Sequence, residues 1–275
     1  MRKFCIVFIG IVLYGQSLQA QTFEELVIKS YEYSDSSDLP AAEESLKAAM
    51  RLEPANKLNF ALLTNLGTIQ RRQGKYEDAL ISYSAALSQR PKDEVILLNR
   101  AKLYTEVGEA EKAIFDYNTL IDIFPTHEEG LFSRGLLYIN TGQYVLAETD
   151  FNFILKTYDD TFLGRFGYAI LEKARGSYDN SEIIFDYLAE KYPDNMRIFE
   201  ERAELYFLTK RNARAISDLN KVFASTTEPS AELYMLRGRI KLAQREKESA
   251  AIDFRKARDM GYDAETVERM LKESF

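Results

Sequence analysis

The fold of this chain is decided by a 34-residue unit whose clearest copy runs from Phe60 to Asp93, FALLTNLGTIQRRQGKYEDALISYSAALSQRPKD. The first half of the unit places the small residue Gly67 among large apolar residues. The second half places Ala79 one helical turn before Tyr83. The same residue types recur 34 positions further on, at Ala113, Tyr117 and Pro125. A period of this length indicates stacked supersecondary units rather than one closed globule.

Three positions of the repeat recur with the same residue size in all seven copies. The first small position is occupied by Ser30, Gly67, Ala101, Gly135, Ala169, Ala203 and Gly238. The second is occupied by Ala42, Ala79, Ala113, Ala147, Ser181, Ala215 and Ala250. Four residues later stands a large one: Leu46, Tyr83, Tyr117, Phe151, Phe185, Leu219 or Phe254. Because a bulky side chain at a close helix crossing would overpack at a cost of roughly 1–3 kcal/mol, the alternation predicts hairpins whose two helices interlock.

The pattern resembles the tetratricopeptide repeat, a helix–turn–helix unit of this length. The matching segments are 23–56, 60–93, 94–127, 128–161, 162–195, 196–229 and 231–264. The resemblance implies an all-α fold: a right-handed α-solenoid of about seven stacked repeats in a single domain over 21–275, ended by a capping helix over 263–275. Second helices are expected near 40–53, 77–90, 111–124, 145–158, 179–192, 213–226 and 248–260. Asp159 and Tyr262 depart from the pattern, because the family has proline at these positions.

The first twenty residues have a different character. Arg2 and Lys3 precede an apolar run over 4–14 and small residues up to Ala20, which is the pattern of a secretory signal peptide. We expect cleavage near Gln21 and an exported product, periplasmic or secreted, of bacterial type. A retained membrane anchor is the alternative, although the apolar run is short for a bilayer span.

Composition argues against several classes of function. Removal of Arg2 and Lys3 would change the net charge from −7 to −9, which disfavours nucleic acid or an anionic membrane as partner. The single cysteine lies in the leader, so no thiolate metal site or cysteine nucleophile is expected in the mature chain. His127, the only histidine, is expected to be a solvated turn residue. With no phosphate-binding glycine motif either, the sequence predicts a protein that is not an enzyme and has no cofactor, no metal and no membrane insertion after cleavage.

The family resemblance implies a groove lined by the first helices. Carried over by register, the candidate partner-binding residues are Asn65, Arg71, Arg72, Asn99, Lys102, Phe132, Leu136, Ile139, Phe166, Ile170, Glu200, Glu201 and Glu204. We expect the apolar residues among them to be groove rather than hairpin core, and the glutamates to attract a basic or mixed-charge partner end. The family's clamp for a C-terminal carboxylate is not matched around Asn65 or Asn99.

Two interpretations of the central apolar patch remain open: a pocket for an apolar partner segment, or a packing or self-association contact. The function predicted is a scaffold that binds a protein or peptide, in an envelope complex. A glycan-binding or substrate-capturing surface protein is the alternative, although the chain has no tryptophan to offer as a flat platform.

A charge correlation between repeats predicts ion pairs. The residue before the first small position and the residue before the large position are Arg and Asp together in four repeats, and neither occurs in the other three. Pairing between successive repeats would place Asp150 opposite Tyr168, so we expect pairs within hairpins. The predicted structural pairs are Arg100–Asp116, Arg134–Asp150, Arg202–Asp218 and Arg237–Asp253.

Overall fold

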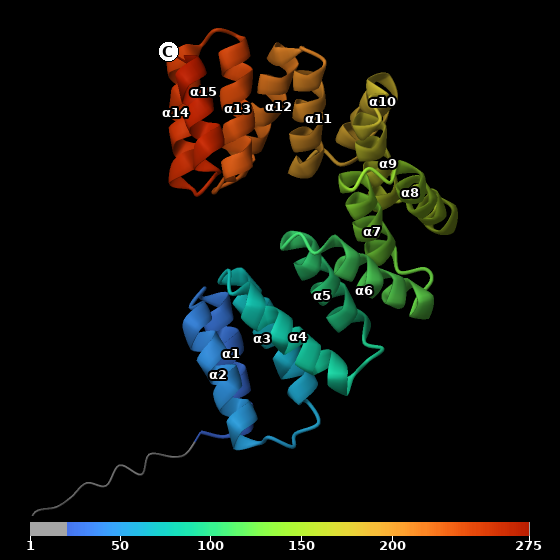
Figure 1. Cartoon of the computed structure of the whole chain (residues 1–275), viewed down its shortest axis with the longest axis vertical. Coiled ribbons are helices and arrows are strands. Elements are labelled where there is room, and N and C mark those ends of the chain that lie inside the picture. The colour runs from blue at the N-terminus through green and yellow to red at the C-terminus, as the bar shows by residue number, and fades with distance from the viewer. Residues whose placement is uncertain (1–20, 275) are drawn as a thin grey trace, which may run out of the picture. The chain divides into compact units, whose positions relative to one another are not determined.

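The computed structural model describes residues 21–274, and these form fifteen α-helices with no strand among them (Figure 1). The predicted signal peptide over 1–20 lies outside the described residues, as does Phe275 at the end of the predicted cap. The chain divides into two compact units, residues 1–99 and 100–275, with the division inside helix α5. The expectation of a single domain stays a prediction.

Unit 1 contains two complete hairpins. Their helices are α1 (Phe23–Asp35), α2 (Leu39–Leu52), α3 (Asn59–Arg72) and α4 (Tyr76–Gln89), followed by the first part of α5 (Glu94–Glu106). Thr22 starts the first hairpin with a capping box, since its hydroxyl accepts from the Glu25 amide while the Glu25 carboxylate accepts from the Thr22 amide. Phe23, Leu26, Leu46, Leu62 and Leu66 belong to the apolar core of this unit.

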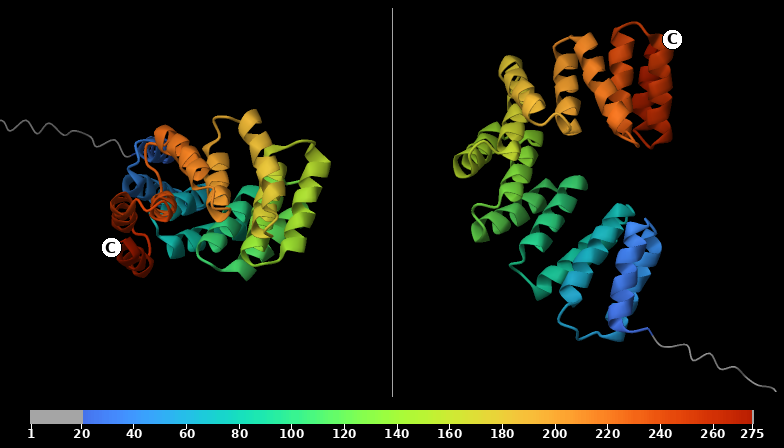
Figure 2. Two further views of the ribbon diagram at one scale, coloured as in Figure 1. Left: turned by 90° about the horizontal axis from the view of Figure 1, so that it is seen from above. Right: turned by 180° about the vertical axis from the view of Figure 1, so that it is seen from behind.

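Unit 2 contains the remaining hairpins and a final helix. Its helices are α6 (Ala110–Ile123), α7 (Glu128–Asn140), α8 (Tyr144–Tyr158), α9 (Phe162–Ala174), α10 (Tyr178–Lys191), α11 (Met196–Leu208), α12 (Asn212–Ser225), α13 (Ala231–Ala243), α14 (Lys247–Asp259) and α15 (Ala264–Ser274). Every second helix of a hairpin begins one residue before the position predicted from the repeat. Helices α13, α14 and α15 lie side by side (Figure 2), and Val267 of α15 is fully buried there, as a capping helix requires.

Left-handed residues reverse the chain between the helices of most hairpins. At Gly74, Gly108, Gly142 and Gly176 the backbone φ is between +73° and +80°, a conformation that glycine adopts without steric cost. In the first of these turns the Lys75 amide donates to the Gln70 carbonyl, which satisfies an otherwise unpaired carbonyl at the end of α3. Lys210 and Arg245 take the same conformation in the last two hairpins.

The junction between α8 and α9 shows how the fold accommodates the missing proline. Asp159 and Asp160 both have positive φ, 40° and 48°, so the chain leaves α8 through two consecutive left-handed residues. The Asp160 carboxylate accepts hydrogen bonds from Arg165, Tyr187 and Lys191, and these contacts hold the turn against α10. The departure from the repeat pattern therefore changes one connection and leaves the hairpins on either side intact.

The predicted interlock of small and large residues is present in the hairpins that use glycine. A Cβ atom added at Gly67 would lie 2.8 Å from the Tyr83 ring, and one added at Gly238 would lie 2.5 Å from Phe254 Cε1. Phe151 is enclosed from two sides, by Gly135 of its own hairpin and by Gly167 of the next. Its ring is fully buried, so glycine on α7 and α9 sets how closely three helices approach.

A buried carboxylate joins the two hairpins of unit 1. Glu43 on α2 has only 4% of its side chain exposed, and it accepts contacts from Lys47 (2.7 Å), Lys75 (2.8 Å), Gln70 (3.2 Å) and Gln73 (2.9 Å). Burial alone would raise the pKa of Glu43, but these donors outweigh it and lower the pKa to about 2. The ionised carboxylate is therefore the form that the folded chain stabilises.

The enclosure of Phe151 predicts that Gly135→Ala destabilises the fold, although helix propensity alone favours alanine. Alanine is a better helix former than glycine by about 1 kcal/mol, yet Gly135→Ala is expected to lower the free energy of unfolding by roughly 1–3 kcal/mol through overpacking. Denaturant titration followed by circular dichroism measures this, and Phe151→Leu in the same background should restore part of the loss. A Gly135→Ala variant as stable as the wild type would contradict the interlock.

The Glu43 network predicts an acid-sensitive contribution to stability. Because the pKa is lowered on folding, this contribution is present above pH 4.5, the ordinary value, and is lost as the pH falls toward about 2. The loss should amount to roughly 3 kcal/mol. Unfolding titrations between pH 6 and pH 2 should show a shallower pH dependence for Glu43→Gln than for the wild type. Glu44→Gln is the matched control, because Glu44 is 65% exposed and should behave as the wild type.

Candidate functional site

A cavity of about 720 Å³ opens on the face formed by first helices of unit 2. Phe132 and Leu136 of α7 and Leu163 of α9 contribute its apolar part, and Arg197 of α11 contributes a cation. The residues of the α6–α7 turn and the ends of neighbouring helices complete the lining: Lys102, Thr126, His127, Glu128, Glu129, Ser133 and Tyr158. A second cavity of about 690 Å³ shares Arg197 with the first and is lined by residues 191–197 and Glu200.

Most polar side chains around the first cavity already have partners. Lys102 pairs with Glu129, and the Thr161 hydroxyl donates to the Glu128 carboxylate. His127 is half-buried, and its Nδ1 accepts a hydrogen bond of 3.0 Å from the Gly130 amide, which caps α7. His127 therefore lies in the turn as expected, and the helix N-terminus supplies an amide donor that orients its ring.

The interpretation of Phe132 and Phe166 as groove residues outside the hairpin core is wrong. Their exposed fractions are 5% and 1%, and both belong to the large apolar core of unit 2. The Phe132 ring centroid lies 6.2 Å from that of Phe151, and the Phe166 centroid lies 6.0 Å from that of Phe185. The register placed them on the correct helices, but the close packing of the glycine-containing helices α7 and α9 encloses their rings. Leu136, Ile139, Leu163 and Ile170 are half-buried beside them.

Two glutamates of the expected acidic end of the groove share one lysine partner within the chain. Lys173 of α9, whose side chain is only 9% exposed, pairs with Glu201 at 2.6 Å and also with Glu204. Burial lowers the pKa of Lys173, and the two carboxylates raise it. The net effect is an increase in the pKa, so the ammonium form is stabilised. Lys173 offsets one of these two negative charges, and the expectation that the glutamates attract a basic or mixed-charge partner end stays a prediction. Lys173 stands at the twelfth position of its first helix, so the family register could have identified it.

Glu200 is the glutamate of this group that forms no ion pair in the described part of the chain. It is half-buried and lines the second cavity. Burial and the neighbouring Glu201 raise its pKa, and Arg197 lowers it, with a net increase.

Two of the polar candidate residues of unit 1 bind side chains of helix α1. The Asn65 amide donates to the Tyr31 hydroxyl at 3.2 Å, and Arg72 Nη1 donates to the Ser34 hydroxyl at 3.0 Å. Arg71 and Asn99 are half-buried. These contacts link α3 to α1, so part of the polar stretch serves the stacking of the first two hairpins.

All four predicted Arg–Asp pairs are present and bidentate. Nε and Nη2 of each arginine donate to the two carboxylate oxygens, at 2.7 and 2.8 Å for Arg100–Asp116 and at 2.9 and 2.6 Å for Arg134–Asp150. Arg202–Asp218 and Arg237–Asp253 have the same geometry, with distances between 2.6 and 2.9 Å. The aspartates are buried, so the pairs join the two helices of a hairpin away from solvent.

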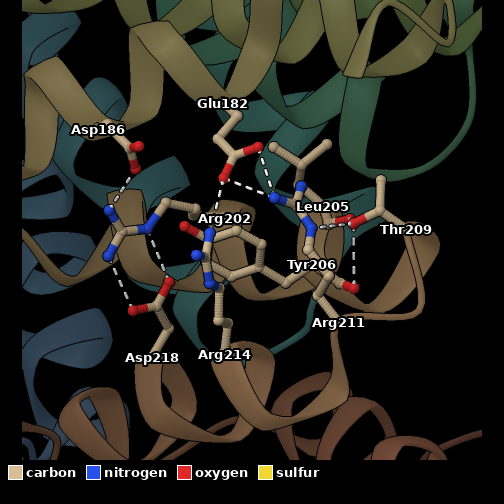
Figure 3. A network of polar contacts seen from close by, with 9 residues as sticks. All are labelled: Glu182, Asp186, Arg202, Leu205, Tyr206, Thr209, Arg211, Arg214 and Asp218. Atoms are coloured by element: carbon tan, nitrogen blue, oxygen red, sulfur yellow. Dashed lines mark hydrogen bonds and ion pairs between the residues drawn. The ribbon is translucent and has the colours of Figure 1, made fainter. Parts of the chain in front are cut away.

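Two of these arginines also reach the preceding hairpin, which the repeat comparison did not predict. Arg134 Nη1 donates to Asn118 Oδ1 at 2.6 Å, and Arg202 Nη1 donates to Asp186 Oδ1 at 2.8 Å. Figure 3 shows Arg202 between Asp218 and Asp186, with Glu182 bound by Arg211 and Arg214 close by. Each guanidinium therefore connects three helices, and the position of the first helix is fixed relative to both second helices that flank it.

Repeat 5 lacks the pair and uses another contact. Tyr168 stands at the arginine position, and its hydroxyl donates to Glu148 Oε1 of the preceding hairpin at 3.1 Å. Arg175 donates to Glu148 Oε2 at 2.6 Å. The connection between hairpins is thus retained where the connection within the hairpin is absent.

Residues 21–274 contain neither a cluster suited to a metal ion nor a helix suited to a bilayer. Within that range no three His, Asp or Glu side chains are arranged to hold a metal ion. None of the helices in the same range combines the length and the apolar character that a bilayer crossing needs.

These features define a helical-repeat scaffold with a groove. A family model described as tetratricopeptide repeat matches residues 29–94, and a second with the same description matches 95–127. The chain is 57% identical to a tetratricopeptide repeat protein from Parabacteroides merdae ATCC 43184, with a TM-score of 0.79, over 92% of this chain and 98% of that one. This chain belongs to the tetratricopeptide-repeat family. No curated protein matches it.

More distant structures share the fold alone. A chain of the APC/C hetero-tetramer Cut9-Hcn1 is 14% identical, with a TM-score of 0.65 over 92% of this chain and 56% of that one. PilW, a widely conserved type IV pilus biogenesis factor, is 20% identical, with a TM-score of 0.60 over 79% of this chain and 98% of that one. The family fold generally serves as a non-catalytic scaffold for protein interactions.

The buried ion pairs predict a large effect of removing one partner. Asp150→Ala should lower the free energy of unfolding by roughly 3–5 kcal/mol, because it leaves the Arg134 guanidinium without its carboxylate. The double variant Arg134→Met, Asp150→Leu should recover most of that loss. Asp259→Ala is the control, since the Arg258–Asp259 pair is exposed and should contribute about 0–1 kcal/mol. An Asp150→Ala variant within about 1 kcal/mol of the wild type would show the pair to be dispensable.

Proposed function

We propose that this chain is a non-catalytic scaffold that binds an extended segment of a partner protein along the first-helix face of unit 2. The observation that supports the proposal is the cavity of about 720 Å³, in which the half-buried Leu136 and Leu163 lie beside polar side chains. A concave site with an apolar floor and a few polar groups is the usual form of a binding pocket. The apolar residues account for affinity, and the polar rim accounts for orientation.

We also propose that the protein acts after export, in the periplasm or outside the cell, as part of an envelope complex. The basic and apolar leader over 1–20 supports this part of the proposal. The partner of such a scaffold is a protein or peptide, and the carboxylate-rich surface of the chain makes nucleic acid an unsuitable ligand.

Site-specific crosslinking in the cells that make the protein tests both parts. A photoreactive side chain at position 163 should form an adduct with a discrete partner, recovered from the envelope fraction or the medium. The same group at position 145 is the control, because Val145 on α8 is 73% exposed and does not line the cavity. Adducts of equal yield at both positions would contradict binding along the first-helix face. Adducts found in the cytoplasmic fraction would contradict export.

A further inference from the structure

Arg197 differs from the other arginines that face the groove. Its guanidinium carbon lies 5.0 Å from the centroid of Phe166 and 5.8 Å from the centroid of Phe132, and the side chain is exposed. Arg134 and Arg202 are each bound to a buried aspartate, whereas no carboxylate in the described part of the chain lies within 4.0 Å of Arg197. Its side chain lines both the first and the second cavity.

The other cation around the first cavity, Lys102, already has a partner. Lys102 pairs with Glu129, Glu128 accepts a hydrogen bond from Thr161, and the Nδ1 of His127 is an acceptor for the Gly130 amide. Glu200 stands one turn further along α11, beside the second cavity, and forms no ion pair with Arg197. Arg197 is therefore the cation of the first cavity that forms no ion pair within the described residues.

The surroundings of the Arg197 guanidinium favour the binding of a carboxylate. One face of it lies over aromatic rings, a cation–π arrangement that leaves the N–H groups at its edge free to donate. A planar guanidinium donates two parallel hydrogen bonds to a carboxylate, and a water-poor apolar surface strengthens them. Phe132, Leu136 and Leu163 supply such a surface directly beside Arg197.

We infer that Arg197 selects partner segments in which an aspartate or glutamate stands next to a large apolar residue. The side-chain carboxylate pairs with the guanidinium of Arg197, and the apolar side chain enters the cavity bounded by Phe132, Leu136 and Leu163. This inference rests on the proposed function and adds the chemistry of the segment that the groove accepts. The expectation from the sequence is different: a basic or mixed-charge end of the partner near the glutamates of α11.

Selection from a random heptapeptide library displayed on phage tests the inference on the mature chain. The selected peptides should be enriched in an acidic residue adjacent to a large apolar one. A synthetic peptide from the selection should bind about tenfold or more weakly to Arg197→Gln, the loss expected for a hydrogen-bonded charge. Replacing its acidic residue with the matching amide should weaken binding to the wild type similarly and have little further effect on Arg197→Gln.

Arg239→Gln is the matched control. Arg239 is also exposed and lies 4.9 Å from the centroid of a phenylalanine, Phe207, but it lines neither cavity. Binding to this variant should equal binding to the wild type, and circular dichroism should show all variants folded.

Two further outcomes separate the inference from the proposed function. If selected peptides require the cavity, so that Leu163→Asp abolishes binding, but show no acidic preference and bind Arg197→Gln equally well, the inference is overturned and the proposed function stands. If no peptide is selected, or if binding is unchanged by Leu163→Asp, the proposed function fails and the inference fails with it.

Discussion

The close approach of a small residue on one helix to a large ring on the next is the contact on which this fold depends. Phe151 shows it most clearly, because Gly135 and Gly167 leave room for its ring between three helices. A side chain at either glycine would push α7 or α9 away from α8, and interiors packed to native density do not absorb such a displacement cheaply. The spacing of the hairpins is therefore set by residues that carry no functional chemistry of their own.

The bidentate Arg–Asp pairs fix the rotation of the helices relative to one another, in addition to their spacing. Apolar packing holds two helices together without fixing their rotation strongly, whereas a bidentate pair requires both groups in one plane. Arg134 and Arg202 each bind an aspartate of their own hairpin and an acceptor of the hairpin before, so the first helix is oriented by two neighbours. Because α7 and α11 also carry Leu136 and Arg197, these buried pairs orient side chains that line the cavity.

The candidate site follows from the same packing. Phe132 and Phe166 are core residues, and their rings form the surface on which Arg197 lies. A partner would therefore contact the half-buried Leu136 and Leu163 and the exposed guanidinium rather than the phenylalanines themselves. Lys173 has a complementary effect, since its single charge offsets part of the negative charge of Glu201 and Glu204.

The sequence alone determined the helices and their pairing. Small and large residues recur with one period, and this local pattern fixes where helices begin, which faces they bury and which arginine meets which aspartate. What it could not determine is how exposed a residue on a first helix remains, because that depends on how closely the neighbouring first helix approaches. Leu163 and Arg197 hold the same position in successive repeats, yet Leu163 is half-buried and Arg197 is exposed. Only the tertiary structure decides this, since exposure and free charge result from contacts between repeats that no single repeat contains.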